Sequence, residues 1–147
     1  MPVVKPRSPE RAVARTDEEW REKLGGDAYR VLRRSSTERP FTGRWVHPGQ
    51  KGTFRCAGCE TELFAADDQF DSGSGWPSFT RPTDDDVIES RRDFSMLSPR
   101  TEVVCRTCGG HLGHVFRDGP APTGLRYCIN DCALSLDEGG SGRAAKA

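Results

Sequence analysis

The chain has 147 residues, of which 34% are hydrophobic and 30% are charged, with 22 basic and 22 acidic side chains. This length suits one ordinary domain with a sizeable core. The balanced charge argues against a nucleic-acid binder that relies on a basic surface, and no apolar run is long enough to suggest a membrane span. The 16 Gly and 10 Pro predict a domain rich in loops.

The two ends of the chain differ in composition from the middle. Residues 1–15 mix Pro and Arg without the apolar core of a secretory signal, so we expect a disordered segment there. Residues 137–147 are rich in Gly and Ala and are predicted to form a flexible tail. A single domain is therefore expected over residues 16–136.

Two short helices are predicted at the start of this domain. Thr16 and Glu19 have the spacing of a capping box, and Gly25-Gly26 predicts the end of the first helix. A second helix is expected to begin near Asp27. Its inward-facing residues are predicted to be Ala28, Val31 and Leu32.

From residue 45 onward, short runs rich in β-branched and aromatic residues alternate with Gly, Pro and Asp. This pattern predicts antiparallel strands in a small, mainly β domain. The predicted strands are Gly52–Arg55, Val87–Glu89, Glu102–Val104, Val115–Phe116, Leu125–Ile129 and Ala133–Leu136.

Four of the six cysteines form two Cys-x-x-Cys pairs, Cys56 with Cys59 and Cys105 with Cys108. Two such pairs supply the four thiolates that Zn²⁺ prefers in a tetrahedral site. A single pair could instead be a redox motif, and the same thiolates would bind iron. Because four thiolates leave no open position for a substrate, we expect one structural Zn²⁺ whose loss unfolds the domain.

The remaining cysteines, Cys128 and Cys132, lie near the end of the predicted domain. On an extended strand, Arg126, Cys128 and Asn130 share one face. A cationic neighbour favours a thiolate, so this face could present a nucleophile, with nearby histidines as proton donors. A buried cysteine that packs as a small hydrophobic residue is the alternative, and His114 could equally be an ordinary core residue.

Longer motifs follow one another along the chain: Arg39–Gly43, Phe70–Phe79, Arg100–Val103, His111–Phe116, Asp118–Pro120 and Arg126–Asn130. In kind and in order they resemble those of the methionine-R-sulfoxide reductases of the B type. The resemblance runs from about Glu38 to Leu136, and the two Cys-x-x-Cys pairs stand where zinc-containing members carry theirs. It implies a mainly β fold of two antiparallel sheets with short N-terminal helices.

The resemblance also implies a reaction. Cys128 would attack the sulfur of methionine R-sulfoxide, chiefly in proteins, leaving a sulfenic acid on Cys128 and releasing methionine. Oxygen leaves poorly unless it is protonated, and the resemblance assigns the acid to His114, with His111 in support. The other implied site residues are Arg126 and Asn130, which orient or polarise, Asp118, which positions a histidine, and Trp76, an apolar wall for the methyl group.

The chain departs from the family's pattern in three places. Ser74 stands where many members have a resolving cysteine, and serine cannot condense with a sulfenic acid. Asp131-Cys132 replaces a common Ser-Ala pair, and strand alternation predicts that Asp131 points away from Cys128. Leu97-Ser98-Pro99 replaces another common sequence and could reshape the rim of the pocket.

Cys132 is one candidate for the resolving thiol. Four residues of strand span about 13 Å, whereas a disulfide needs Cα atoms within roughly 7 Å. We therefore expect thioredoxin or a small thiol to reduce Cys128 directly. Cys132, or a cysteine released from the metal site, remains an alternative.

Two other functions stay open on the sequence alone. A zinc-ribbon module that docks nucleic acid or protein would need the four metal cysteines but not the Cys128 motif. A redox sensor would use Cys128 and Cys132 as a switch. We expect a monomer with no nucleic-acid or membrane partner, and the absence of a signal segment favours the cytoplasm.

Overall fold

The computed structural model describes residue 13, residues 15–94 and residues 99–138. The helices are α1 (Asp17–Leu24) and α2 (Gly26–Arg34), and the 3₁₀ turns are η1 (Ala66–Asp68), η2 (Asp85–Val87) and η3 (Asp131–Ala133). The strands are β1 (Thr53–Cys56), β2 (Glu62–Ala65), β3 (Gln69–Phe70), β4 (Ser78–Phe79), β5 (Ile88–Asp93), β6 (Arg100–Cys105), β7 (His111–Phe116), β8 (Arg126–Ile129) and β9 (Leu134–Asp137).

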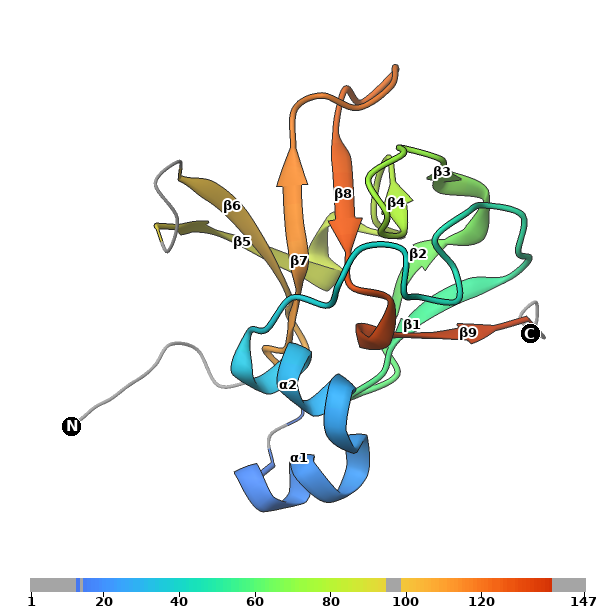
Figure 1. The fold of residues 1–147 in the computed structure, drawn as a ribbon. Helices are drawn as coiled ribbons and strands as arrows, with labels where there is room; N and C mark the ends of the chain where they lie inside the picture. Colours follow the sequence, from blue (N-terminus) through green and yellow to red (C-terminus); the bar gives the residue numbers. More distant parts are fainter. Residues whose placement is uncertain (1–12, 14, 95–98, 139–147) are drawn as a thin grey trace.

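The strands form two antiparallel sheets, as expected. The smaller sheet has the order β2-β1-β9, and the larger has the order β3-β4-β8-β7-β6-β5. In Figure 1 the two helices lie at one end of the molecule, and β7 and β8 run side by side through its centre. The predicted mainly β class is confirmed.

The helices follow their local sequence signals. Thr16 and Glu19 exchange both hydrogen bonds of a capping box, and α1 ends at Gly25, whose φ of 80° suits glycine. In α2 the predicted inward residues Val31 and Leu32 are buried, and so is Tyr29, which the pattern did not predict. Ala28 is only half-buried.

Both helices pack against the Cys-x-x-Cys turns. A Cβ atom added at Gly58 would lie 3.2 Å from the Trp20 ring, and one added at Gly110 would lie 2.7 Å from a Leu32 methyl group. The Arg33 guanidinium donates a hydrogen bond to the carbonyl oxygen of Cys108 at 2.9 Å. The helices therefore cover the end of the sheets that carries the four cysteines.

The strand predictions were right in position for most of the domain, but they missed β2, β3 and β4. The predicted strand Ala133–Leu136 begins later than expected, because residues 131–133 form η3. Asp137 was expected in the tail, but it still pairs with Thr53 in β1. Val13, expected in the disordered segment, donates its N–H to Thr107 at 3.0 Å; the rest of both ends lies outside the described residues, apart from Arg15 and Glu138.

Three fully buried phenylalanines join the two sheets. Phe64 of β2 stacks on Phe79 of β4 with ring centroids 4.5 Å apart, and Phe54 of β1 meets Phe79 edge-on at 5.3 Å. Burying each phenyl ring stabilises the fold by roughly 1.5–3 kcal/mol. Tyr127 and Ile129 of β8 belong to the same core, so the alternate residues of β8 face the other way.

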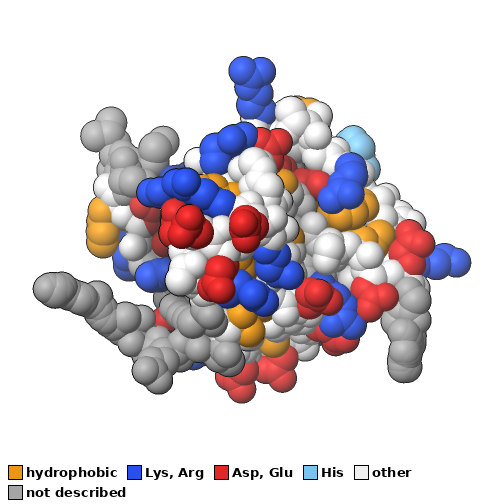
Figure 2. Space-filling view, turned by 90° about the horizontal axis from the view of Figure 1, so that it is seen from below, with side chains coloured by type: hydrophobic (Ala, Val, Ile, Leu, Met, Phe, Trp, Pro, Cys, Tyr) orange, Lys and Arg blue, Asp and Glu red, His pale blue; other side chains and the backbone are white. Residues whose placement is uncertain are grey.

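Surface charge is mixed on the face shown in Figure 2, where basic and acidic side chains lie among one another. Among the described residues, no helix is long and apolar enough to cross a membrane.

Candidate functional site

Strand β8 brings the predicted reactive residues to one pocket. Arg126, Cys128 and Asn130 all line a pocket of about 270 Å³, as strand alternation predicted. The other lining residues are Thr37, Ser74, Trp76, Arg100, Gly113, His114 and Phe116. The pocket therefore holds five of the seven residues predicted for catalysis and substrate binding, all except His111 and Asp118.

The Cys128 thiol is half-buried at this pocket. Its Sγ lies 3.8 Å from Oγ of Ser74, which in turn lies 2.8 Å from Oγ of Ser72. Burial raises the pKa of the Cys128 thiol above its ordinary value, although the hydrogen bond from Ser74 and the charge of Arg126 act in the opposite direction. Burial therefore favours the protonated thiol in the free protein.

His114 lies directly opposite Cys128 in the register of β7 and β8. Its Nε2 atom lies 2.8 Å from Oδ2 of Asp93, which also accepts a hydrogen bond from Arg100 at 3.2 Å. Burial lowers the pKa of His114 below its usual value, and the hydrogen bond to Asp93 only partly opposes this. Asp93 has no signal in the sequence, because this contact forms only after β5, β6 and β7 have paired.

His111 belongs to the region behind the pocket. Its Nδ1 atom lies 2.6 Å from Oε2 of Glu102, and its ring centroid is 5.5 Å from that of His114. Burial alone would raise the pKa of Glu102, but its hydrogen bond with His111 and the charges of His111 and Arg91 hold it below the usual value. Within the described part of the chain, the buried Nε2 of His111 has no hydrogen-bond partner. His111 packs edge-on against His114 and does not line the pocket.

Asp118 was expected to position a histidine, and among the described residues its carboxylate pairs with Arg126. Its exposed carboxylate accepts two hydrogen bonds from the Arg126 guanidinium, at 2.9 and 3.2 Å. Arg126 lowers the pKa of Asp118, and its guanidinium lies 4.3 Å from the Phe116 ring centroid. Asp118 therefore holds the cation beside Cys128, and the histidines are held by other carboxylates.

Trp76 and Asn130 are both tied to the segment that precedes β1. The Trp76 indole N–H donates to the carbonyl oxygen of Glu38 at 3.1 Å. Asn130 is 3% exposed; its amide donates to the carbonyl of Leu112 and accepts the N–H of Glu38. Glu38 was not among the predicted site residues, since no local sequence pattern connects it with residues 76 and 130.

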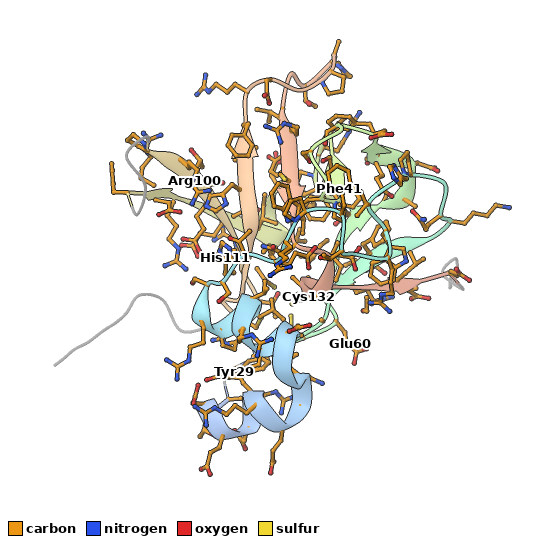
Figure 3. All side chains as sticks on the ribbon, in the orientation of Figure 1. Tyr29, Phe41, Glu60, Arg100, His111 and Cys132 are labelled. Carbon is orange, nitrogen blue, oxygen red and sulfur yellow. The ribbon has the colours of Figure 1, made fainter. Side chains whose placement is uncertain are left out.

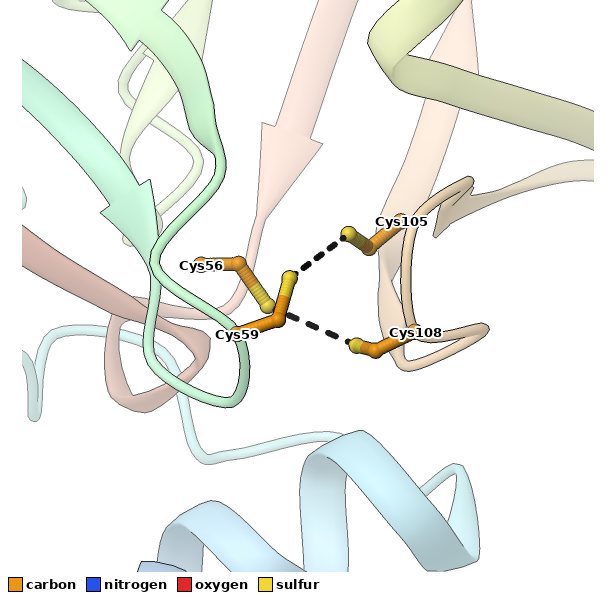
Figure 4. Close-up of side chains that lie close together, drawn as sticks. All are labelled: Cys56, Cys59, Cys105 and Cys108. Atoms are coloured by element: carbon orange, nitrogen blue, oxygen red, sulfur yellow. Dashed lines mark hydrogen bonds between the residues drawn. The ribbon is translucent and has the colours of Figure 1, made fainter. Parts of the chain in front are cut away.

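The four Cys-x-x-Cys thiols converge on one point at the helical end of the fold (Figure 4). All their sulfur atoms lie within 4.8 Å of one another, with 3.7 Å between Cys56 and Cys108 and 3.5 Å between Cys59 and Cys105. Four sulfurs at about 2.3 Å from a tetrahedral Zn²⁺ would be about 3.8 Å apart. The predicted grouping is confirmed, and the donor set fits a metal ion.

The model of the SelR domain matches residues 24–138 of this chain. Over 137 residues the chain is 51% identical to the peptide methionine sulfoxide reductase MsrB of Bradyrhizobium diazoefficiens, covering 93% of this chain and 99% of that protein. The chain belongs to the MsrB family. The MsrB proteins of Leptospira interrogans and Methanosarcina barkeri are each 49% identical over 86% of this chain, covering 96% and 89% of their own lengths.

Cys132 of this MsrB chain does not continue the strand that carries Cys128. Strand β8 ends at Ile129 and the chain turns into η3, so the extended geometry assumed for residues 128–132 was wrong. Cys132 lines a different pocket, of about 530 Å³, and its Sγ lies 3.7 Å from the carbonyl oxygen of Asp27. Figure 3 shows it on η3, near the helices. Burial and the carboxylate of Glu38 raise the pKa of the Cys132 thiol to about 12.

The other two departures from the MsrB pattern have different outcomes. Asp131 is 3% exposed and accepts the Trp45 N–H at 2.6 Å, so it points away from Cys128 as expected. Leu97 and Ser98 lie outside the described residues, and Pro99 is exposed at the start of β6.

Proposed function

We propose that this MsrB chain reduces the R epimer of methionine sulfoxide, chiefly within proteins, at the pocket that contains Cys128. One observation carries the proposal. A thiol, an imidazole and an indole, from Cys128, His114 and Trp76, line the same pocket. The names of the relatives support a peptide substrate.

In the proposed reaction, the Cys128 thiolate attacks and the substrate loses its oxygen. The thiolate attacks the sulfoxide sulfur and forms an S–S bond to it, while protonated His114 gives its proton to the sulfoxide oxygen. The hydroxyl group then passes to Cys128, so the substrate's S–O bond and the S–S bond break as the S–O bond to Cys128 forms. The methionine sulfur gains two electrons, and the Cys128 sulfur loses two and becomes a sulfenic acid. Because the oxygen leaves protonated, no oxide ion has to be released.

Other side chains of the pocket would bind the substrate and favour the Cys128 thiolate. Trp76 would give an apolar wall to the methyl group of the substrate, and Asn130 fixes the adjoining backbone. Arg126, held by Asp118, places a positive charge beside Cys128 and favours its thiolate. The charge of Arg126 and the hydrogen bond with Ser74 oppose the effect of burial on the Cys128 thiol and so favour the reactive thiolate.

Recycling is proposed to use an external dithiol or two small thiols. One thiol would attack the sulfenic acid and release water, and a second would break the mixed disulfide to regenerate Cys128. Two observations support this route over an internal one. Ser74 is the residue beside the Cys128 sulfur, and Cys132 lines another pocket with its pKa raised to about 12. Thioredoxin is the proposed protein reductant.

We further propose Zn²⁺ as the ion held by Cys56, Cys59, Cys105 and Cys108. When bound, it would cross-link the two Cys-x-x-Cys turns and have no part in the redox step, because the four thiolates complete its coordination. The spacing of the sulfur atoms supports this choice. We also propose that the protein is a monomer in the reducing cytoplasm and that it has no nucleic-acid partner. The mixed charge on the face in Figure 2 supports the absence of a nucleic-acid partner.

The decisive experiment assays the R and S epimers separately, first with dithiothreitol and then with thioredoxin. We expect turnover of the R epimer alone, and its loss in Cys128→Ser with metal content retained. Cys132→Ser is the matched control and should turn over as the parent does. Parental turnover in Cys128→Ser would overturn the assignment of the nucleophile. Mass spectrometry after peroxide treatment tests the alternative of a redox sensor, which requires a Cys128–Cys132 disulfide.

A further inference from the structure

Glu38, in the segment between α2 and β1, forms hydrogen bonds through each of its polar groups. Its backbone N–H donates to Oδ1 of Asn130 at 3.0 Å, and its carbonyl oxygen accepts the Trp76 indole N–H at 3.1 Å. Its carboxylate accepts the backbone N–H groups of Asp131 at 2.8 Å and Cys132 at 3.0 Å. One residue thus connects two walls of the Cys128 pocket with η3.

The carboxylate does what a capping side chain would ordinarily do for η3. Asn130 precedes this turn but makes no capping hydrogen bond with its side chain, since its amide is engaged with Leu112 and Glu38. The first N–H groups of η3 therefore depend on Glu38. Hydrogen bonds to a carboxylate are shorter and stronger than those between neutral groups. The side chain consequently determines where the backbone of residue 38 lies.

The position of that backbone matters to the pocket. The carbonyl of residue 38 is the acceptor for the Trp76 indole, and Thr37 lines the pocket itself. A second bond, from the Phe41 N–H to the Gly75 carbonyl at 2.7 Å, holds the same segment against the residue before Trp76. We propose that Glu38 is a positioning residue of the reductase, which acts through Trp76 and Asn130 to hold the substrate-binding wall in place.

This inference rests on the proposed function of the pocket, and it predicts an effect on binding rather than on chemistry. Glu38 is not among the residues that line the Cys128 pocket. Its loss should displace the Trp76 indole while Cys128 and His114 stay in register on β8 and β7. The Michaelis constant should therefore rise, and kcat should change little.

The test compares Glu38→Gln and Glu38→Ala, with Glu22→Gln on α1 as a control at an exposed glutamate. In Glu38→Gln an amide NH₂ faces one of the two backbone N–H donors, so one bond is lost; in Glu38→Ala both are lost. We expect KM for an R-sulfoxide peptide to rise about threefold and about tenfold respectively. We expect kcat to stay within about twofold. The control should match the parent.

Two further measurements separate positioning from a general loss of fold. In ¹⁵N NMR spectra the Trp76 indole N–H resonance should move in Glu38→Gln, while the Trp20 indole resonance should not. In a double-mutant cycle with Trp76→Phe, which keeps an aromatic wall but removes the N–H, the effects on KM should be less than additive. Additive effects, or an unchanged Trp76 resonance, would overturn the inference. If the parent fails to reduce the R epimer, the proposed function fails, and the resonance still decides whether Glu38 holds Trp76.

Discussion

Nε2 of His114 lies 2.8 Å from Oδ2 of Asp93, so a carboxylate from the edge strand β5 holds the imidazole opposite Cys128. Burial lowers the pKa of His114, and burial raises the pKa of Cys128. Burial therefore favours the uncharged form of both groups in the free protein. The reactive pair, a thiolate with an imidazolium, contains the same number of protons as the neutral pair, so the two forms interconvert by internal proton transfer.

The first prediction is a broad plateau in the pH profile of kcat/KM. Below the pKa of His114, which burial lowers from its usual value, an extra proton removes the thiolate. Above the pKa of Cys128, which burial raises from its usual value, a lost proton removes the acid. Between these limits the fraction of reactive pair does not depend on pH. Initial rates with an R-sulfoxide peptide from pH 5 to 10 measure this, and a tenfold rise per unit from pH 7 to 9 would contradict it.

The second prediction concerns Asp93→Asn. The carboxylate raises the pKa of His114 against the effect of burial, so its neutralisation should lower that pKa further. The acid limb of the profile should then move to lower pH. Because less imidazolium coexists with the thiolate, kcat/KM on the plateau should fall several-fold. The measurement is the full pH profile of the variant.

Asp118→Asn is the matched control for this change. Asp118 contacts Arg126 and no histidine, so the acid limb should stay where it is. If both variants moved the acid limb equally, the Asp93–His114 contact would have no special effect on the proton donor. If Asp93→Asn only lowered Tm and kept the parental kinetics, the Asp93–His114 contact would have no role in catalysis.

The third prediction concerns Ser74→Cys. Ser74 Oγ lies 3.8 Å from Cys128 Sγ, so a thiol at residue 74 would sit beside a sulfenic acid formed at Cys128. Condensation should release water and form a disulfide between the introduced thiol and Cys128 after one turnover. Mass spectrometry of peptides after one equivalent of substrate should detect this bond in the variant. The parent should show sulfenic acid at Cys128 and no Cys128–Cys132 bond; a sulfenic acid that persists in the variant would contradict the prediction.

The sequence predicted those features that depend on short-range pattern. The capping box at Thr16, the shared face of Arg126 and Cys128, and the convergence of the Cys-x-x-Cys pairs all follow from local geometry. Strands β3 and β4 have only two residues each, too few for an alternating pattern.

Other features depend on which distant segments meet. Asp93 reaches His114 across two intervening strand pairings, and Glu38 reaches Trp76 and Asn130 from a loop. No periodicity in the chain encodes such contacts. The prediction that residues 128–132 form an extended strand, which placed Cys132 wrongly, failed for a related reason. The turn η3 depends on the Glu38 carboxylate, which lies more than ninety residues away in the chain and accepts the N–H groups of residues 131 and 132.

The fourth prediction concerns Cys56→Ser, which removes one of the four thiols. Cys56 is fully buried, and the helices pack on the two turns that this cluster joins, with Trp20 against Gly58. Loss of the ligand should release the metal, and the helical end should then lose its packing because binding and folding of such sites are coupled. We expect near-unit zinc content in the parent, little in the variant, a lower Tm, and exposure of Trp20 seen by fluorescence. Cys132→Ser, which removes a thiol outside the cluster, should keep its zinc and Tm; a metal-free parent with the same Tm would contradict the structural role of the metal.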